Sequence, residues 1–118
     1  MKPKHNEQPM QFGLKAHVIQ QIVDVLKKQS EIKSAILYGS RAMGNFRPGS
    51  DIDLTLTGES LTYSVVARVE NEIDDLLLPY LFDISILSHI ENPNVVDHIR
   101  RVGITFYQKE AAITPQNT

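Results

Sequence analysis

The stretch "YGSRAMGNFRPGSDIDLTL", residues 38–56, decides how this chain folds. In it a Gly-Ser pair, Gly39 and Ser40, precedes an Asp-x-Asp pair, Asp51 and Asp53, with ten residues between Ser40 and Asp51. The apolar runs "KSAILYG" and "DIDLTLTG", one on each side of the loop, are typical of strands that end at a glycine. Two strands so close in sequence favour a hairpin-like pair within a mixed or antiparallel sheet.

The rest of the chain supplies helices and a further strand for this sheet. Apolar residues recur at steps of three and four over residues 12–29 and 61–77, which predicts two long amphipathic helices. Residues 81–87, "LFDISIL", predict a third strand, and residues 92–103 predict a short helix. Residues 104–108 fit either an edge strand or the end of that helix. The order predicts a small α/β (α+β) domain with a mixed β-sheet packed by helices.

Length and composition favour one globular domain. The chain has 118 residues, of which 42% are hydrophobic and 22% are charged, as in ordinary folded proteins. The polar start and end of the sequence are not expected to join the core. We therefore expect residues 1–11 to form a flexible leader, residues 12–110 to form the domain, and residues 111–118 to form a disordered tail.

Charge and residue types exclude several classes of protein. The absence of cysteine excludes disulfides and thiolate metal sites, and the four histidines show no metal-ligand spacing. A formal net charge of −2 argues against direct binding to duplex nucleic acid. The longest apolar run is too short to cross a bilayer, and the N-terminal stretch lacks the apolar core of a signal peptide. We therefore expect no membrane partner and a cytoplasmic protein.

Three aspartates form the candidate catalytic and metal-binding set. Asp51 and Asp53 are two residues apart on a predicted strand, so their side chains point to the same face of the sheet. Asp83 lies in the third apolar strand and would join them if that strand neighbours the second. Three carboxylates beside a phosphate suit two Mg²⁺ ions. The alternative is that the aspartates cap the loop or face water.

Gly39, Ser40 and Arg41 form the candidate nucleotide-binding set. A glycine after a strand allows the backbone to turn sharply and to approach a ligand closely. Ser40 is able to cap a short following helix, whose first N–H groups would favour a phosphate. Arg41 adds a cation that is able to bind a phosphate with two hydrogen bonds. The alternative is an ordinary strand-to-helix turn with a solvated arginine.

The composite pattern "GSRAMGNFRPGSDIDL", followed by Asp83, resembles the signature of the DNA polymerase β-like nucleotidyltransferases. The short chain looks like the minimal nucleotidyltransferases of that superfamily. This resemblance implies a β-sheet with helices packed on one face. It also implies that Gly39 and Ser40 bind nucleotide phosphates, that Asp51, Asp53 and Asp83 bind the metals, and that Asp83 is the base for the attacking hydroxyl.

The resemblance also implies a partner. Minimal nucleotidyltransferases act with helical HEPN-domain proteins, including toxin–antitoxin pairs in which the toxin is adenylylated. The first hypothesis is therefore Mg²⁺-dependent transfer of a nucleoside monophosphate, AMP from ATP, to a hydroxyl of a HEPN-type toxin, with this chain as the antitoxin. The second is a nucleotide-binding regulatory subunit without turnover, and the third is transfer to a small-molecule acceptor. Homo-oligomerisation is left open.

Overall fold

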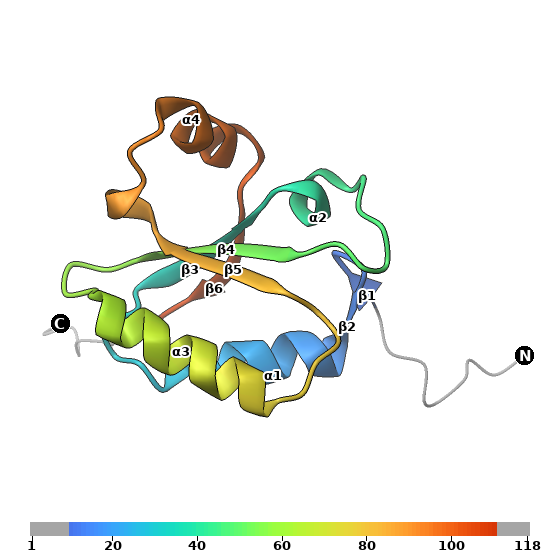
Figure 1. Ribbon diagram of the computed structural model, residues 1–118, viewed down its shortest axis with the longest axis horizontal. Coiled ribbons are helices and arrows are strands. Elements are labelled where there is room, and N and C mark those ends of the chain that lie inside the picture. The colour runs from blue at the N-terminus through green and yellow to red at the C-terminus, as the bar shows by residue number, and fades with distance from the viewer. Residues whose placement is uncertain (1–9, 111–118) are drawn as a thin grey trace, which may run out of the picture.

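Two long helices, α1 (Ala16–Lys27) and α3 (Tyr63–Asp75), cover one face of a four-stranded sheet (Figure 1). The computed structural model describes residues 10–110. The other elements, in chain order, are β1 (Met10–Gln11), β2 (Leu14–Lys15), β3 (Ser34–Tyr38), α2 (Ser40–Met43), β4 (Ile52–Thr57), β5 (Phe82–Ile86), the 3₁₀ turn η1 (Leu87–His89), α4 (Pro93–Val102) and β6 (Ile104–Gln108).

The sheet is mixed, in the strand order β5-β4-β3-β6. β4 pairs with β3 and β6 pairs with β3, both antiparallel, whereas β5 pairs with β4 in parallel after the α3 crossover. The predicted fold class is therefore confirmed. Of the two interpretations of residues 104–108, the edge strand is correct.

The hydrophobic core lies between the sheet and the two long helices. Side chains alternate between the faces of a strand, so every second residue of β4 points toward α1 and α3. Leu54 and Leu56 on that side are fully buried, as are Ile22 of α1 and Val69 of α3. The stripe of apolar residues on each helix therefore packs onto the apolar face of the sheet, which explains the helical spacing in the sequence.

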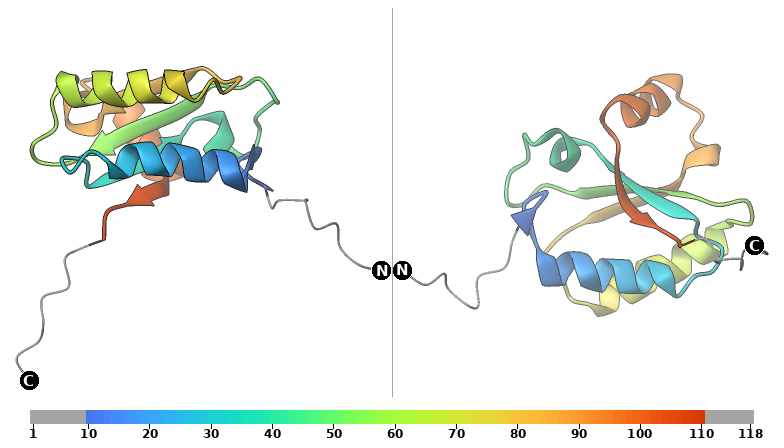
Figure 2. Two further views of the ribbon diagram at one scale, coloured as in Figure 1. Left: turned by 90° about the horizontal axis from the view of Figure 1, so that it is seen from below. Right: turned by 180° about the vertical axis from the view of Figure 1, so that it is seen from behind.

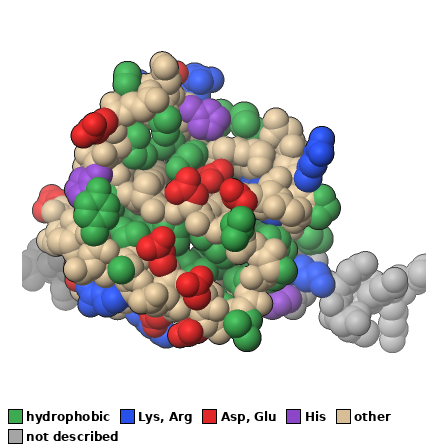
Figure 3. Space-filling model, viewed as in Figure 1, with side chains coloured by type: hydrophobic (Ala, Val, Ile, Leu, Met, Phe, Trp, Pro, Cys, Tyr) green, Lys and Arg blue, Asp and Glu red, His purple; other side chains and the backbone are tan. Residues whose placement is uncertain are grey.

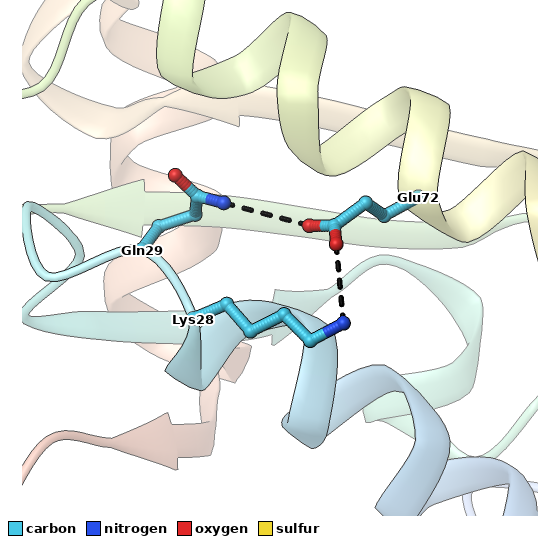
Figure 4. A network of polar contacts seen from close by, with 3 residues as sticks. All are labelled: Lys28, Gln29 and Glu72. Atoms are coloured by element: carbon cyan, nitrogen blue, oxygen red, sulfur yellow. Dashed lines mark hydrogen bonds and ion pairs between the residues drawn. The ribbon is translucent and has the colours of Figure 1, made fainter.

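A small polar network also joins the two long helices (Figure 4). Glu72 of α3 accepts a hydrogen bond from the Lys28 ammonium at 3.2 Å and another from the Gln29 side-chain amide at 3.4 Å. Both donors follow the last residue of α1. Figure 2 shows α1 and α3 side by side on the same face of the sheet, which is the arrangement that this network requires.

The opposite face of the sheet is only partly covered, by α4. This helix begins at Pro93, and the Asn92 side chain caps it by accepting a hydrogen bond from the Asn94 backbone N–H at 2.9 Å. At the other end of the helix, Gly103 lies against Ile36 of β3, on the face away from α1 and α3. The two long helices thus share one face, as expected, and a third helix lies over the other.

The start of the domain differs from the expected helix over residues 12–29. A two-stranded hairpin of β1 and β2 comes first, and α1 begins only at Ala16. Phe12 and Gly13 form its turn with φ angles of 58° and 73°, which no helix allows. Met10 and Gln11, assigned above to the leader, form β1, whereas the rest of that leader and the tail 111–118 lie outside the described residues.

None of the helices within residues 10–110 has the length and apolar character needed to cross a membrane.

Candidate active site

The sheet register brings Asp53 and Asp83 together. β4 and β5 run in parallel with Asp53 directly opposite Asp83, and on its other side Asp53 is directly opposite Tyr38 of β3. All three residues alternate with buried core residues, so their side chains lie on the face away from α1 and α3. Acidic side chains gather over β4 and β5 in Figure 3, on an open part of the surface. The condition set for Asp83, that its strand neighbours the second strand, is met.

Asp51 completes the group from the loop that precedes β4. It is exposed and lies two residues before Asp53, whose side chain is half-buried. Burial raises the pKa of Asp53 above its ordinary value, and the negative charges of Asp83 and Asp51 raise it further, while His98 has the opposite effect. The three predicted carboxylates therefore lie close enough to repel one another.

Gly39 meets a strict steric requirement at the end of β3. Its φ angle is 74°, and a β-carbon at this position would run into the carboxylate of Asp53. Within the protein, the Gly39 backbone lies close to the Asp53 side chain. The predicted close approach of Gly39 to a ligand stays a prediction. Gly39 is also the N-cap residue of α2, so Ser40 is the first residue of that helix and does not occupy the cap position that the sequence suggested for it.

Arg41 has a different role from the one expected. Its side chain is 1% exposed, and its guanidinium donates hydrogen bonds to three backbone carbonyl groups. These are Phe12 at 2.8 Å, Pro48 at 3.2 Å, and Ser50 at 2.8 Å and 3.1 Å. A buried guanidinium that is bonded to backbone carbonyl groups is not placed to bind a phosphate, so the structure does not support nucleotide binding by Arg41.

The buried arginine instead holds the loop that carries the site. Its guanidinium carbon lies 5.4 Å from the centre of the Phe46 ring and 5.0 Å from the centre of the Tyr80 ring. Cation–π contacts and carbonyl hydrogen bonds together satisfy a charge that would be costly to bury alone. Because Ser50 accepts two of these bonds and directly precedes Asp51, Arg41 fixes the point from which Asp51 leaves the loop.

Two aromatic residues of the site were not foreseen. Tyr38 precedes the Gly39 turn, and burial raises its pKa above the ordinary value, which a hydrogen bond with Ser85 partly offsets and the carboxylates of Asp83 and Asp53 reinforce. His98 of α4 contacts Tyr38 edge-on, with 6.2 Å between the ring centres. No local pattern marks His98, because its place depends on how α4 packs across the sheet.

The donor set fits a hard divalent cation. Asp53 and Asp83 face each other across neighbouring strands, their side-chain ligands are all oxygen, and a cation between them would relieve their repulsion. Within the described part of the chain, no three His, Cys, Asp or Glu side chains are already arranged around one point. Asp53, which lies close to both other carboxylates, therefore carries the fit, and exposed Asp51 would turn toward it.

Comparisons with known proteins identify the family and the fold of this chain. The family described as "Polymerase beta, Nucleotidyltransferase" matches residues 20–112. No curated protein sequence matches. Among solved structures, a toxin–antitoxin complex with AMP-PNP has a chain with a TM-score of 0.63 and 16% identity, over 78% of this chain and 74% of that one.

A second solved structure has the same fold. It is a complex of a tri-AMPylated HEPN toxin from Shewanella oneidensis with an MNT antitoxin, with a TM-score of 0.58 and 14% identity, over 79% of this chain and 71% of that one. At such low identities these likenesses show the shared fold. The family match covers most of the sequence and contains the Gly-Ser turn and all three aspartates, so the chain belongs to the polymerase β-type nucleotidyltransferase family.

Proposed function

We propose that this protein transfers AMP from ATP to a hydroxyl group on a partner protein of the helical HEPN type, and that it thereby acts as an antitoxin. The observation that carries the proposal is that Asp53 lies opposite Asp83 and near Asp51, beside the Gly39 turn on an open face of the sheet. The solved structures that share the fold support it, since one contains AMP-PNP and another contains an AMPylated toxin.

The turn at Gly39 would hold the nucleotide. Its backbone leaves β3 beside the Asp53 carboxylate and enters α2 at Ser40. The backbone N–H groups of this turn and the Ser40 hydroxyl would donate hydrogen bonds to the phosphates. The α-phosphorus would then lie next to the carboxylates, and the turn would orient the reacting group without taking part in bond breaking.

The aspartates would divide two tasks. Asp51 and Asp53 would hold Mg²⁺, which neutralises phosphate charge when bound, and Asp83 would share in that binding. Asp83 is exposed on the edge strand β5, where an incoming hydroxyl is able to reach it. Asp83 would take the hydroxyl proton while the oxygen forms a bond to the α-phosphorus. The bond from that phosphorus to the bridging oxygen breaks, and pyrophosphate leaves.

An open site suits a protein acceptor. Asp51 and Asp83 are exposed, so the surface of a second protein is able to bring its hydroxyl directly to them. A partner that supplies its own surface would complete the site.

The test measures transfer and binding on the same preparations. The protein is expressed with the product of the neighbouring gene and incubated with Mg²⁺ and each of the four nucleoside triphosphates, and intact masses are measured. We expect a gain of AMP on the partner. Asp83→Asn should keep nucleotide affinity but lose transfer by about 10²–10⁴-fold, the range for a general base. Asp75→Asn, an exposed aspartate at the end of α3, is the matched control.

The outcomes separate the hypotheses. A parent protein that binds ATP but modifies nothing with any triphosphate would leave a regulatory nucleotide-binding subunit. If Asp83→Asn transfers as well as the parent does, Asp83 is not the base.

A further inference from the structure

Because Arg41 is buried away from the proposed nucleotide site, that site has no arginine side chain to bind the phosphates. A nucleoside triphosphate carries several negative charges and would lie beside three carboxylates. Bound Mg²⁺ would neutralise part of this charge, but a donor from the protein would still be needed to fix the phosphates in one position. The expected donor, Arg41, instead donates its four hydrogen bonds to backbone carbonyl groups.

His98 lies where such a donor is needed. It belongs to α4, which lies on the same side of the sheet as α2, so that the polar face of the strands lies between the two helices (Figure 1). Its ring contacts Tyr38 edge-on at 6.2 Å between centres, and Tyr38 directly precedes the Gly39 turn. His98 is also close enough to Asp53 to act against the rise in the pKa of that carboxyl.

The fold makes little use of the polar atoms of His98. The side chain is half-buried, and its ring nitrogens make no hydrogen bond to the part of the chain that the structure describes. The contact with Tyr38 uses the carbon framework of the two rings. Its neighbour Ile99, in contrast, is buried against the sheet and provides the packing that holds α4 in place. An imidazole N–H is thus available to a ligand that lies on this face.

We propose that His98 is a nucleotide-binding residue whose imidazole donates a hydrogen bond to a phosphate oxygen, opposite the Gly39 turn. This inference rests on the proposed function, since it assumes that phosphates lie at that turn. The nucleotide would then be held between two helices, with α2 on one side and α4 on the other. Positioning of this kind contributes through geometry and leaves the bond-making step to the aspartates.

The test separates the hydrogen bond from the packing. His98→Phe keeps a ring against Tyr38 but has no N–H group, whereas His98→Gln loses the ring but keeps a donor. The matched control is His89→Phe, because His89 also contacts a tyrosine, Tyr63, with 5.2 Å between ring centres. Isothermal titration in Mg²⁺ uses two probes: ATP, and inorganic tripolyphosphate, which has phosphates but no base.

We expect His98→Phe to bind both probes about 10- to 100-fold more weakly, the size of a hydrogen bond to a charged group. His98→Gln should keep most of the affinity, and His89→Phe should bind like the parent. Thermal melting checks that each variant is folded, and His98→Ala replaces His98→Phe if the latter is not.

Three results would overturn the inference. Equal affinity of His98→Phe and the parent would show that the donor is not used. Equal losses in His98→Phe and His98→Gln would show that the ring matters rather than the N–H group. A loss for ATP but not for tripolyphosphate would place the contact on the base. If the parent itself binds neither probe, the nucleotide site of the proposed function fails together with this inference.

Discussion

The two faces of the sheet carry side chains of opposite character. On the face under α1 and α3, the side chains of β4 that point inward are Leu54 and Leu56, both fully buried. On the other face the same strand presents Asp53, with Asp83 opposite it on β5. The buried leucines and Asp53 alternate along the same strand. Packing of the leucines against the helices therefore also fixes the position of Asp53 relative to Asp83. One face of the sheet therefore packs the hydrophobic core, and the other carries the charged side chains of the candidate site.

Two charged residues repeat this contrast within the site. Arg41 is almost fully buried, and its hydrogen bonds and two aromatic rings satisfy its charge. Asp53 is only half-buried, yet its nearest charged neighbours include two further carboxylates. A buried charge that the fold satisfies is structural. A charge that the fold leaves among like charges is a candidate for ligand binding.

The largest effect should come from the apolar face. Leu54→Ala removes a fully buried side chain and leaves a cavity, which typically lowers the free energy of unfolding by about 2–5 kcal/mol. Chemical denaturation of the purified protein measures this. Leu81→Ala is the matched control, since Leu81 is 73% exposed and its loss should change stability by less than about 0.5 kcal/mol. Similar losses in both variants would contradict the division between the two faces.

The apolar face was largely predictable from the sequence. Apolar residues at steps of three and four predicted both long helices, because one side of each helix is buried. Short apolar runs predicted β3, β4 and β5, because alternate residues of these strands face the core. The β1–β2 hairpin was not predicted, since its turn depends on positive φ angles at Phe12 and Gly13. The position of α4 over the second face also depends on tertiary packing, which no local period records.

A smaller loss of stability should follow from Arg41→Met, which keeps much of the length of the side chain but removes its donors. The carbonyl groups of Phe12, Pro48 and Ser50 lose their partner, but these residues are exposed or half-buried, so water is able to replace part of the lost hydrogen bonding and the total cost should be about 1–3 kcal/mol. Chemical denaturation again gives the size. Arg47→Met in the same loop is the control, because Arg47 is exposed. If Arg41→Met melts like the parent but loses only ATP affinity, Arg41 binds phosphate after all.

The candidate site shows where sequence reasoning stops. Residue types and spacing were enough to single out Asp51, Asp53, Asp83 and Gly39, because the backbone places them within one short loop and two neighbouring strands. They were not enough for Arg41, because the sequence Gly-Ser-Arg is the same whether the arginine side chain faces a phosphate or a buried carbonyl group. The place of His98 depends on a helix that begins forty residues after Asp53.

The smallest effect concerns Asp53 in the absence of metal. Its pKa is raised in the folded protein, so between the ordinary and the raised pKa the folded state holds a proton that the unfolded state has lost. Stability from this group is therefore complete below the ordinary pKa and falls as the pH rises through the raised value. At neutral pH the ionised carboxylate opposes folding.

Asp53→Asn should consequently raise the melting temperature by a few degrees at pH 7 in buffer with a chelator, because it removes a charge from beside Asp83 and Asp51. The gain should shrink as the pH falls, since the parent then becomes protonated. Added Mg²⁺ should raise the melting temperature of the parent more than that of the variant. Asp75→Asn should change neither value. A variant that melts below the parent at pH 7 without metal would mean that the repulsion on this face does not oppose folding.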